Sequence, residues 1–375
     1  MSLKIGIIGL PNVGKSTLFN ALLKKRVALS ANYPFATVEP NVGVVAVPDA
    51  RLSLLADLVA REEKMENPPP IVPAVVEFVD IAGLVKGASK GAGLGNQFLS
   101  HIREVDAIVH VLRDFEDENV ARAGAENPDS DKVTVETELA LADLQVLEKL
   151  VVAQEKQAKI SKDSLDRIRL DILNKMKEKL ERGEIGSFDF AQDLRDERLK
   201  DWFTHLPLLT IKPMLYVLNV SESHLGGVAI TTPLRCDSQN ELVICAKLEE
   251  ELADYSEEER LEYLKTLGPP AGGGQTGLER LIVKAYDLLG LISFLTAGPK
   301  EIRAWTGRKG TSAVDASGII HTDFVKNFIR AQVISYEKLI EAGSYSTAKQ
   351  KGWIRTEGKD YIIQDGDVVE FLVGS

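Results

Sequence analysis

Residues 9–16 read Gly9-Leu-Pro-Asn-Val-Gly14-Lys15-Ser16, which matches the Walker A spacing of two glycines followed by a lysine and a hydroxyl residue. The apolar segment Leu3 to Gly9 precedes this stretch, and a segment with apolar residues at Leu18, Phe19, Leu22 and Leu23 follows it. Between a strand and a helix, backbone N–H groups cradle phosphate, while Lys15 bridges the outer phosphates and Ser16 offers a hydroxyl to Mg2+. The stretch predicts a P-loop nucleoside-triphosphate hydrolase of α/β class.

The expected nucleotide-binding domain alternates short apolar strands with helices, which predicts a parallel sheet. Its strands are expected at Leu3–Gly9, Val42–Val47, Val75–Asp80 and Ala107–Leu112 and, later in the chain, at Pro213–Asn219 and Leu242–Ala246. A helix from Thr276 to Leu289 is expected to close the sheet. We therefore assign residues 1–117 and 207–290 to this domain.

An insertion at residues 118–206 is rich in Glu, Lys, Leu and Ala. Its apolar residues recur at helical spacing, at Ala140, Leu144, Leu147 and Val151 and again at Leu165, Ile168, Ile172, Met176 and Leu180. This pattern predicts an α-helical hairpin of two packed amphipathic helices. Such a hairpin either stabilises itself or docks a partner, and the spacing is compatible with both.

Residues 291–375 change character again and predict a small α+β domain. Strands are expected at Ile302–Thr306, Gly318–Ile320, Tyr361–Ile363 and Val368–Leu372, around a helix at Thr322–Ile329. Acidic and basic residues nearly balance here, whereas the whole chain carries a net charge of −11. This domain is therefore the least acidic surface that the chain offers to a polyanion.

Composition narrows the class of protein. Hydrophobic residues make up 44% and charged residues 27%, as in soluble globular proteins, and no apolar run approaches the ~20 residues that span a bilayer. Neither the two cysteines, Cys236 and Cys245, nor the five histidines form a metal-ligand pattern. We expect a cytoplasmic protein with no membrane contact and no structural metal, in which any RNA contact is local.

Two further segments are placed to act with the phosphate loop. Asp80-Ile-Ala-Gly83 follows a predicted strand, where the carboxylate can hold a magnesium-bound water and the Gly83 N–H can meet the γ-phosphate. Thr37, in a loop punctuated by prolines, can cap Mg2+ as a first switch. A second switch is expected at residues 84–96, where glycines at 87, 91, 93 and 95 give the backbone freedom.

The segments Gly9–Thr17, Tyr33–Gly43 and Asp80–Phe98 together resemble the Obg-related family of P-loop proteins. Within it, residues 137–144, 219–222 and 320–324 resemble the YchF branch of Obg-like ATPases, and the likeness covers nearly the whole chain. The resemblance implies a nucleotide domain with a helical insertion and a C-terminal TGS domain of β-grasp fold. It also implies ATP as the nucleotide and the ribosome as partner, with RNA contacts through the helical and TGS domains.

The base pocket departs from guanine-specific relatives, which carry Asn-Lys-x-Asp where this chain has Asn219-Val220-Ser-Glu222. Glutamate is one methylene longer than aspartate, so it is misplaced for the paired bonds to guanine N1–H and the 2-amino group. Adenine can instead be read by Asn219 and by backbone groups near Val220 and Cys245-Ala246. The expected ATP-binding residues are Asn12, Val13, Gly14, Lys15, Ser16, Thr17, Asn219, Val220, Glu222, Cys245 and Ala246, with Ser16, Thr37 and Asp80 at Mg2+.

The catalytic group is less defined. Leu84 stands where Ras-like enzymes place a water-orienting glutamine, and Arg122 replaces a histidine that the resemblance implicates in hydrolysis. Arg122 is either an arginine finger or a solvated loop residue, and His101 is either a substitute base or a packing residue. Lys15, Thr37 and Gly83 complete the catalytic candidates.

Asn12 resembles an asparagine that helps to hold K+ in cation-dependent relatives. Three functions stay open at this point: a slow ATPase switch, a GTPase of ribosome assembly or translation, and a nucleotide-sensing adaptor that does not hydrolyse.

Overall fold

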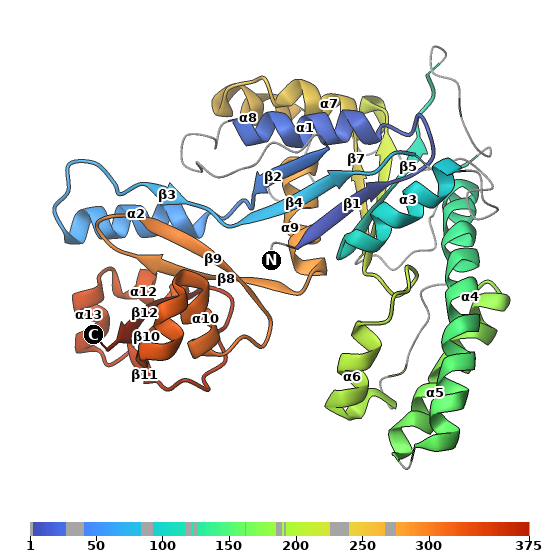
Figure 1. Ribbon diagram of the computed structural model, residues 1–375. Helices are drawn as coiled ribbons and strands as arrows, with labels where there is room; N and C mark the ends of the chain where they lie inside the picture. Colours follow the sequence, from blue (N-terminus) through green and yellow to red (C-terminus); the bar gives the residue numbers. More distant parts are fainter. Residues whose placement is uncertain are drawn as a thin grey trace.

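The computed structural model describes residues 3–27, 41–83, 93–117, 122, 127–161, 163–184, 190, 193–225, 240–266 and 275–374. These residues form two six-stranded sheets and a long helical arm (Figure 1). The arm projects from the first sheet on one side, and the C-terminal sheet lies on the other side of the first sheet. Among the described helices, none combines the length and the apolar character that a membrane span requires.

The first sheet has the strand order β2-β4-β1-β5-β6-β7. Its strands are β1 (Lys4–Ile8), β2 (Val42–Ala46), β4 (Val75–Asp80), β5 (Ala107–Asp114), β6 (Met214–Val220) and β7 (Glu241–Ile244). Its helices are α1 (Lys15–Val27), α3 (Gly93–Glu104), α7 (Ala246–Leu252), α8 (Glu257–Thr266) and α9 (Gly277–Leu288). The expected P-loop α/β fold is confirmed.

One edge of this sheet departs from the parallel pattern. β2 pairs antiparallel with β4, whereas the other neighbours pair in parallel. The chain between them, α2 (Arg51–Glu62) and β3 (Ile71–Val72), does not cross the sheet face. Instead it lies at the far end, beside the C-terminal elements, and returns from the side on which it left (Figure 1). A strand that returns in this way runs antiparallel to the one before it.

The C-terminal sheet has the order β11-β10-β12-β8-β9-β3. Its further strands are β8 (Leu291–Ala297), β9 (Ile302–Arg308), β10 (Phe328–Ser335), β11 (Arg355–Glu357) and β12 (Asp367–Val373). They accompany α10 (Ala313–Ile320), α11 (Thr322–Asn327), α12 (Tyr336–Ala342) and α13 (Tyr345–Gln350). The C-terminal part is thus the expected mixture of helix and strand.

Three local predictions in this part are wrong. The expected strand Gly318–Ile320 is the end of α10, which Ser312 caps and which buries Ala313 and Ala316 on one face. Tyr361–Ile363 forms only an isolated bridge between Ser312 and Ile362. The expected helix Thr322–Ile329 ends early, because from Phe328 onwards the backbone pairs with β12.

The two sheets are joined by α2 and β3. β3 pairs in parallel with β9, so a segment from the first part of the chain completes the C-terminal sheet. Arg51 at the start of α2 bonds Asp365 at 2.7 Å, and the Glu62 carboxylate at its end accepts the N–H groups of Tyr345 and Ser346. The domain division given above, with residues 1–117 assigned to one domain, stays a prediction.

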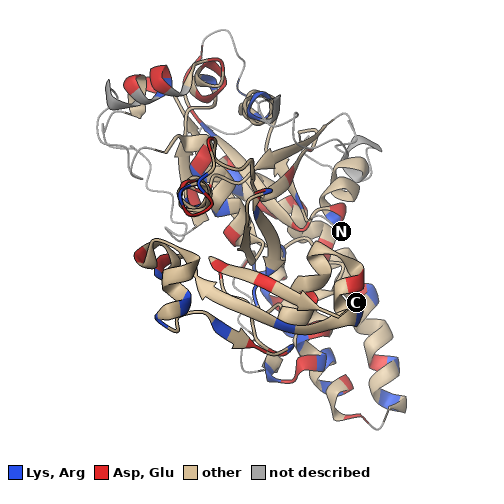
Figure 2. Ribbon diagram, turned by 90° about the vertical axis from the view of Figure 1, so that its left-hand side faces the viewer, with Lys and Arg blue, Asp and Glu red and all other residues tan. Residues whose placement is uncertain are grey.

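The helical arm consists mainly of α4 (Pro128–Ile160) and α5 (Ser164–Glu181), which confirms the expected helical hairpin. The short helices η2 (Asp193–Arg195) and α6 (Glu197–Thr204) follow. Where the chain returns to the sheet, the buried Asp143 carboxylate accepts both N–H groups of Leu209 and Thr210 and the Thr210 hydroxyl. Acidic and basic residues are interspersed along the arm and the C-terminal elements (Figure 2).

Candidate nucleotide-binding site

The phosphate loop joins the end of β1 to the first residue of α1. Gly9 and Gly14 have φ angles of +151° and +95°, and Asn12 has 62°, values that side chains with a Cβ rarely adopt. A Cβ on Gly9 would lie 2.5 Å from the Val111 carbonyl oxygen, and one on Gly14 would lie 2.2 Å from Asn219 Nδ2. Both backbone geometry and close packing therefore require glycine at these two positions.

Lys15 and Gly83 meet beside the phosphate loop. Lys15 is buried as a residue, and its ammonium donates to the Leu10 carbonyl at 2.7 Å. Burial lowers the pKa of Lys15, while the charge of Asp80 opposes that shift. A Cβ on Gly83 would lie 2.9 Å from Lys15 Nζ and 3.3 Å from the Pro11 backbone nitrogen, so Gly83 packs closely against the lysine and the phosphate loop.

Ser16 and Asp80 place a hydroxyl and a carboxylate side by side next to Lys15. The Ser16 hydroxyl donates to Asp80 Oδ2 at 3.4 Å, and burial raises the pKa of the Asp80 carboxyl. Asp80 Oδ1 is buried with no hydrogen-bond partner in the described part of the chain. A hydroxyl and a carboxylate are the hard oxygen ligands that Mg2+ prefers, so these residues fit the expected metal.

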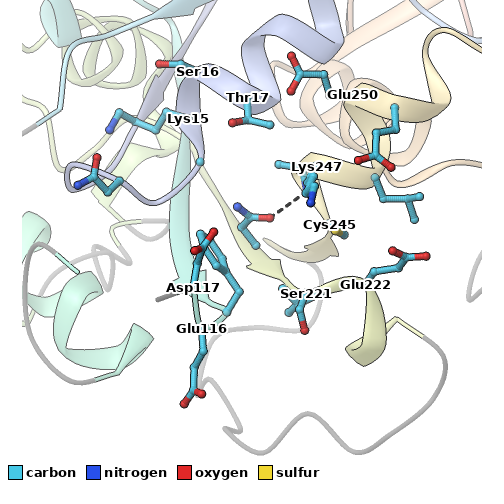
Figure 3. Close-up of a pocket in the computed structure, with 18 residues that line it drawn as sticks. Lys15, Ser16, Thr17, Glu116, Asp117, Ser221, Glu222, Cys245, Lys247 and Glu250 are labelled. Carbon is cyan, nitrogen blue, oxygen red and sulfur yellow. Dashed lines mark hydrogen bonds between the residues drawn. The ribbon is translucent and has the colours of Figure 1, made fainter. Parts of the chain in front are cut away.

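Asn219, near the end of β6, ties the phosphate loop to the base side. Its Nδ2 donates to the Val13 carbonyl and its Oδ1 accepts the Ala246 N–H, both at 2.9 Å. The second of these bonds is the dashed line in Figure 3. Because both polar atoms of the side chain are already bonded within the protein, Asn219 holds two loops in place. The reading of adenine by Asn219 stays a prediction.

A cavity of about 770 Å³ runs from the phosphate loop to η3 (Glu222–His224) and the start of α7 (Figure 3). The cavity brings together most of the expected ATP-binding residues, namely Asn12, Gly14, Lys15, Ser16, Thr17, Asn219, Val220, Glu222, Cys245 and Ala246. Val13, which belongs to the loop itself, is buried. Burial raises the pKa of the Cys245 thiol, so that side chain stays protonated at neutral pH.

Sequence reasoning missed one wall of the cavity, formed by Phe115, Glu116 and Asp117. The Arg113 guanidinium lies 4.5 Å from the centre of the Phe115 ring and also donates to the Asn12 carbonyl. These residues follow β5, the neighbour of β1. Ligands of parallel sheets bind at the carboxyl ends of the strands. The position of these residues directly after a strand next to β1 could therefore have predicted that they line the cavity.

Two curated relatives match almost the full length of the chain. The "Ribosome-binding ATPase YchF" of Bacillus subtilis is 46% identical over 380 residues and 99% of both chains. The protein of the same name from Escherichia coli O157:H7 is 46% identical over 377 residues, again 99% of both. The chain belongs to the YchF family.

A solved structure and two family models extend this finding. The solved "Structure of the Schizosaccharomyces pombe YchF GTPase" is 34% identical, has a TM-score of 0.81, and is matched over 99% of this chain and 98% of its own. The YchF-GTPase_C model, described as a protein of unknown function, matches residues 291–374. A model described as 50S ribosome-binding GTPase matches residues 4–163. The printed names of these YchF proteins disagree on the nucleotide, ATP in the curated relatives and GTP in the solved structure. The choice of nucleotide therefore has to be judged from the base pocket.

Arg122 and His101, two further catalytic candidates of this YchF chain, are not among the residues that line the cavity. Arg122 forms an ion pair with the buried Asp131 at 3.0 Å and donates to the Arg113 carbonyl. These contacts engage its guanidinium within the protein. His101 is an exposed residue of α3. Thr37 and Leu84 lie outside the described residues, as does most of the second switch, and the roles of all four residues stay predictions.

Proposed function

We propose that the protein is an ATP-hydrolysing switch that acts on the ribosome. The observation that carries this proposal is a cavity with a Walker A loop at one end and Glu222, in place of the guanine-binding aspartate, at the other. Curated YchF relatives named ribosome-binding ATPases support it. The reaction is the hydrolysis of ATP to ADP and phosphate, in the cytoplasm.

In the proposed reaction the chain positions charge rather than forming covalent bonds. Lys15 and the N–H groups at the start of α1 hold the phosphates, and the Gly83 N–H meets the γ-phosphate. Ser16 and, through a bound water, Asp80 would hold Mg2+, which when bound neutralises charge on the phosphates. The attacking water is oriented by a group other than Leu84, whose side chain cannot form a hydrogen bond.

K+ is a second proposed cofactor, held beside the phosphates with the help of Asn12. The left-handed backbone of this residue, with φ of 62°, shapes the loop at the cavity wall. Hydrolysis measured in potassium and in sodium buffers tests the proposal, and equal rates contradict it.

The helical arm and the C-terminal domain are the proposed ribosome contacts. Because charges of both signs are interspersed along them (Figure 2), RNA contacts there are expected to be local. A GTPase is the second candidate function, favoured by the likeness to the fission yeast protein, which is named a GTPase. A nucleotide-sensing adaptor without hydrolysis is the third, and the ion pair that engages Arg122 favours it.

Single-turnover hydrolysis distinguishes the three functions. Excess protein is mixed with labelled ATP or GTP in Mg2+ and K+, with Lys15→Ala as the inactive control. Phosphate release from ATP, absent in the control, is expected. Release from GTP alone supports the GTPase, and no release from either nucleotide supports the adaptor. Co-sedimentation with purified ribosomes tests the partner, and a protein that stays in the supernatant with every nucleotide contradicts the proposed ribosome contact.

A further inference from the structure

Glu222 does not stand alone at the base end of the cavity. It begins η3, which one residue separates from the end of β6, and its carboxylate accepts a hydrogen bond from the hydroxyl of Tyr263 on α8. In Figure 3 the Glu222 side chain points away from Lys15 and Asp117. A residue far along the chain therefore orients the carboxylate that replaces the guanine-binding aspartate.

The position of Tyr263 is set by packing as well as by this bond. Its ring packs against the buried cluster of Cys245, Leu248 and Leu252 and forms an edge contact with Tyr255, with ring centres 6.3 Å apart. Phenylalanine would keep these apolar contacts and lose only the hydroxyl. The hydrogen bond can therefore be removed with little effect on the packing around it.

The Tyr263 hydroxyl is protonated at every pH at which the protein is expected to work. The hydrogen bond to Glu222 raises the pKa of Tyr263 to about 12. The phenol therefore keeps its proton and remains a donor. One oxygen of the Glu222 carboxylate accepts from this donor on α8, which fixes the direction in which the carboxylate faces.

This arrangement bears on the choice of base because guanine and adenine need different partners. Guanine presents an N1–H and a 2-amino group side by side, which one carboxylate accepts with both of its oxygens. Adenine lacks both donors at those positions and requires no such acceptor. A carboxylate held by a phenol therefore disfavours guanine and leaves adenine unaffected.

We propose that Tyr263 is a positioning residue for base selection, which holds the Glu222 carboxylate against α8 and so prevents it from pairing with guanine. This inference rests on the proposed function as an ATPase. It explains how Glu222 opposes guanine through its orientation, in addition to its length.

The test compares the binding of non-hydrolysable ATP and GTP analogues by calorimetry, in Mg2+ and with the full chain. In Tyr263→Phe the GTP-to-ATP ratio of Kd values is expected to fall about tenfold, the factor that one hydrogen bond to a charged group carries. Tyr255→Phe is the matched control, because it removes a hydroxyl from the neighbouring ring without touching Glu222, and its ratio is expected to stay unchanged. In a Glu222→Ala background, Tyr263→Phe is expected to change the ratio no further.

A purely structural role for Tyr263 would lower both affinities by the same factor and keep the ratio, which would overturn the inference. So would a change of ratio that persists in the Glu222→Ala background. The Tm of each variant is measured in parallel, so that a loss of both affinities through unfolding is recognised. Tighter binding of the GTP analogue by the unmodified protein would contradict the proposed ATPase. An unchanged ratio in Tyr263→Phe, beside clear ATP preference in the unmodified protein, would contradict the role of Tyr263 alone.

Discussion

Replacing Asn219 by aspartate changes one buried donor into an acceptor and leaves the shape of the side chain intact. In the native protein Nδ2 donates to the Val13 carbonyl at 2.9 Å, while Oδ1 accepts from Ala246. Aspartate retains the second bond but sets an oxygen against the Val13 carbonyl. A buried carbonyl left without a donor costs about 1–3 kcal/mol. Asn219→Asp should therefore lower the free energy of unfolding by at least about that amount at pH 8.

The pH dependence of this variant separates the hydrogen bond from general disruption. Burial raises the pKa of a carboxyl above its value of ~3.9 in the unfolded chain. When the pH falls through the raised pKa, the protonated carboxyl again donates to the Val13 carbonyl. The stability of Asn219→Asp relative to the unmodified protein should therefore increase from pH 8 to pH 5. Asn219→Ala, which has no carboxyl, should show no such recovery.

Hydrogen exchange of α1 amides, read by mass spectrometry, is the suitable assay. The tryptophans Trp202, Trp305 and Trp353 lie on the arm and in the C-terminal part, so their fluorescence does not report on the phosphate loop. Equal protection of α1 in the unmodified protein and Asn219→Asp would show that the bond to Val13 does not hold the loop. The same pH response in the aspartate and alanine variants would show this too.

Three more predictions concern other sites. His110 is fully buried, with neither ring nitrogen hydrogen-bonded among the described residues, and burial lowers its pKa to about 3. Below pH ~6.5 His110 takes up a proton in the unfolded chain but not in the folded protein, which should lower the free energy of unfolding by about 2 kcal/mol at pH 5. In urea unfolding, His110→Leu should not show this part of the decrease. Asp80→Asn should raise the Mg2+ concentration for half-maximal hydrolysis by about 10–100-fold, and an unchanged value would exclude Asp80 from the metal site. Glu62→Ala should destabilise the C-terminal part by about 1–3 kcal/mol in urea. Glu63→Ala, at an exposed neighbouring position, should not. Equal losses in the two variants would contradict a stabilising role for the hydrogen bonds from α13 to Glu62.

The sequence predicted those features that local spacing determines. The Walker A loop depends on a short pattern between a strand and a helix. Asp80 is recognised by its place at the end of a predicted strand. The hairpin of α4 and α5 shows in the spacing of its apolar residues. In each of these cases, neighbouring residues in the chain carry the whole signal.

The features that were missed depend on pairing between distant segments. β3 is only two residues long and becomes a strand because Ile71 pairs with Ile302. β10 begins at Phe328, where pairing with β12 overrides the helical pattern before it. Contacts with other segments decide such short elements, so the local sequence cannot reveal them.

The candidate site shows the same division between local and distant information. An asparagine near the end of a strand can read a base or hold a loop, and only the positions of Val13 and Ala246 show that Asn219 holds loops. Glu222 was singled out by its difference from the guanine motif. Its partner Tyr263 lies 41 residues further along the chain, beyond the reach of any local pattern.

Selection of ATP by the rebuilt base pocket can be measured by calorimetric titration of the purified protein with non-hydrolysable ATP and GTP analogues in Mg2+ and K+, repeated on Glu222→Asp. We expect tighter binding of the ATP analogue by the unmodified protein. We also expect a shift toward the GTP analogue in the variant, because the shorter carboxylate is placed for the paired bonds to guanine. Clear preference of the unmodified protein for the GTP analogue would contradict the proposed selection of ATP and identify an ordinary GTPase switch.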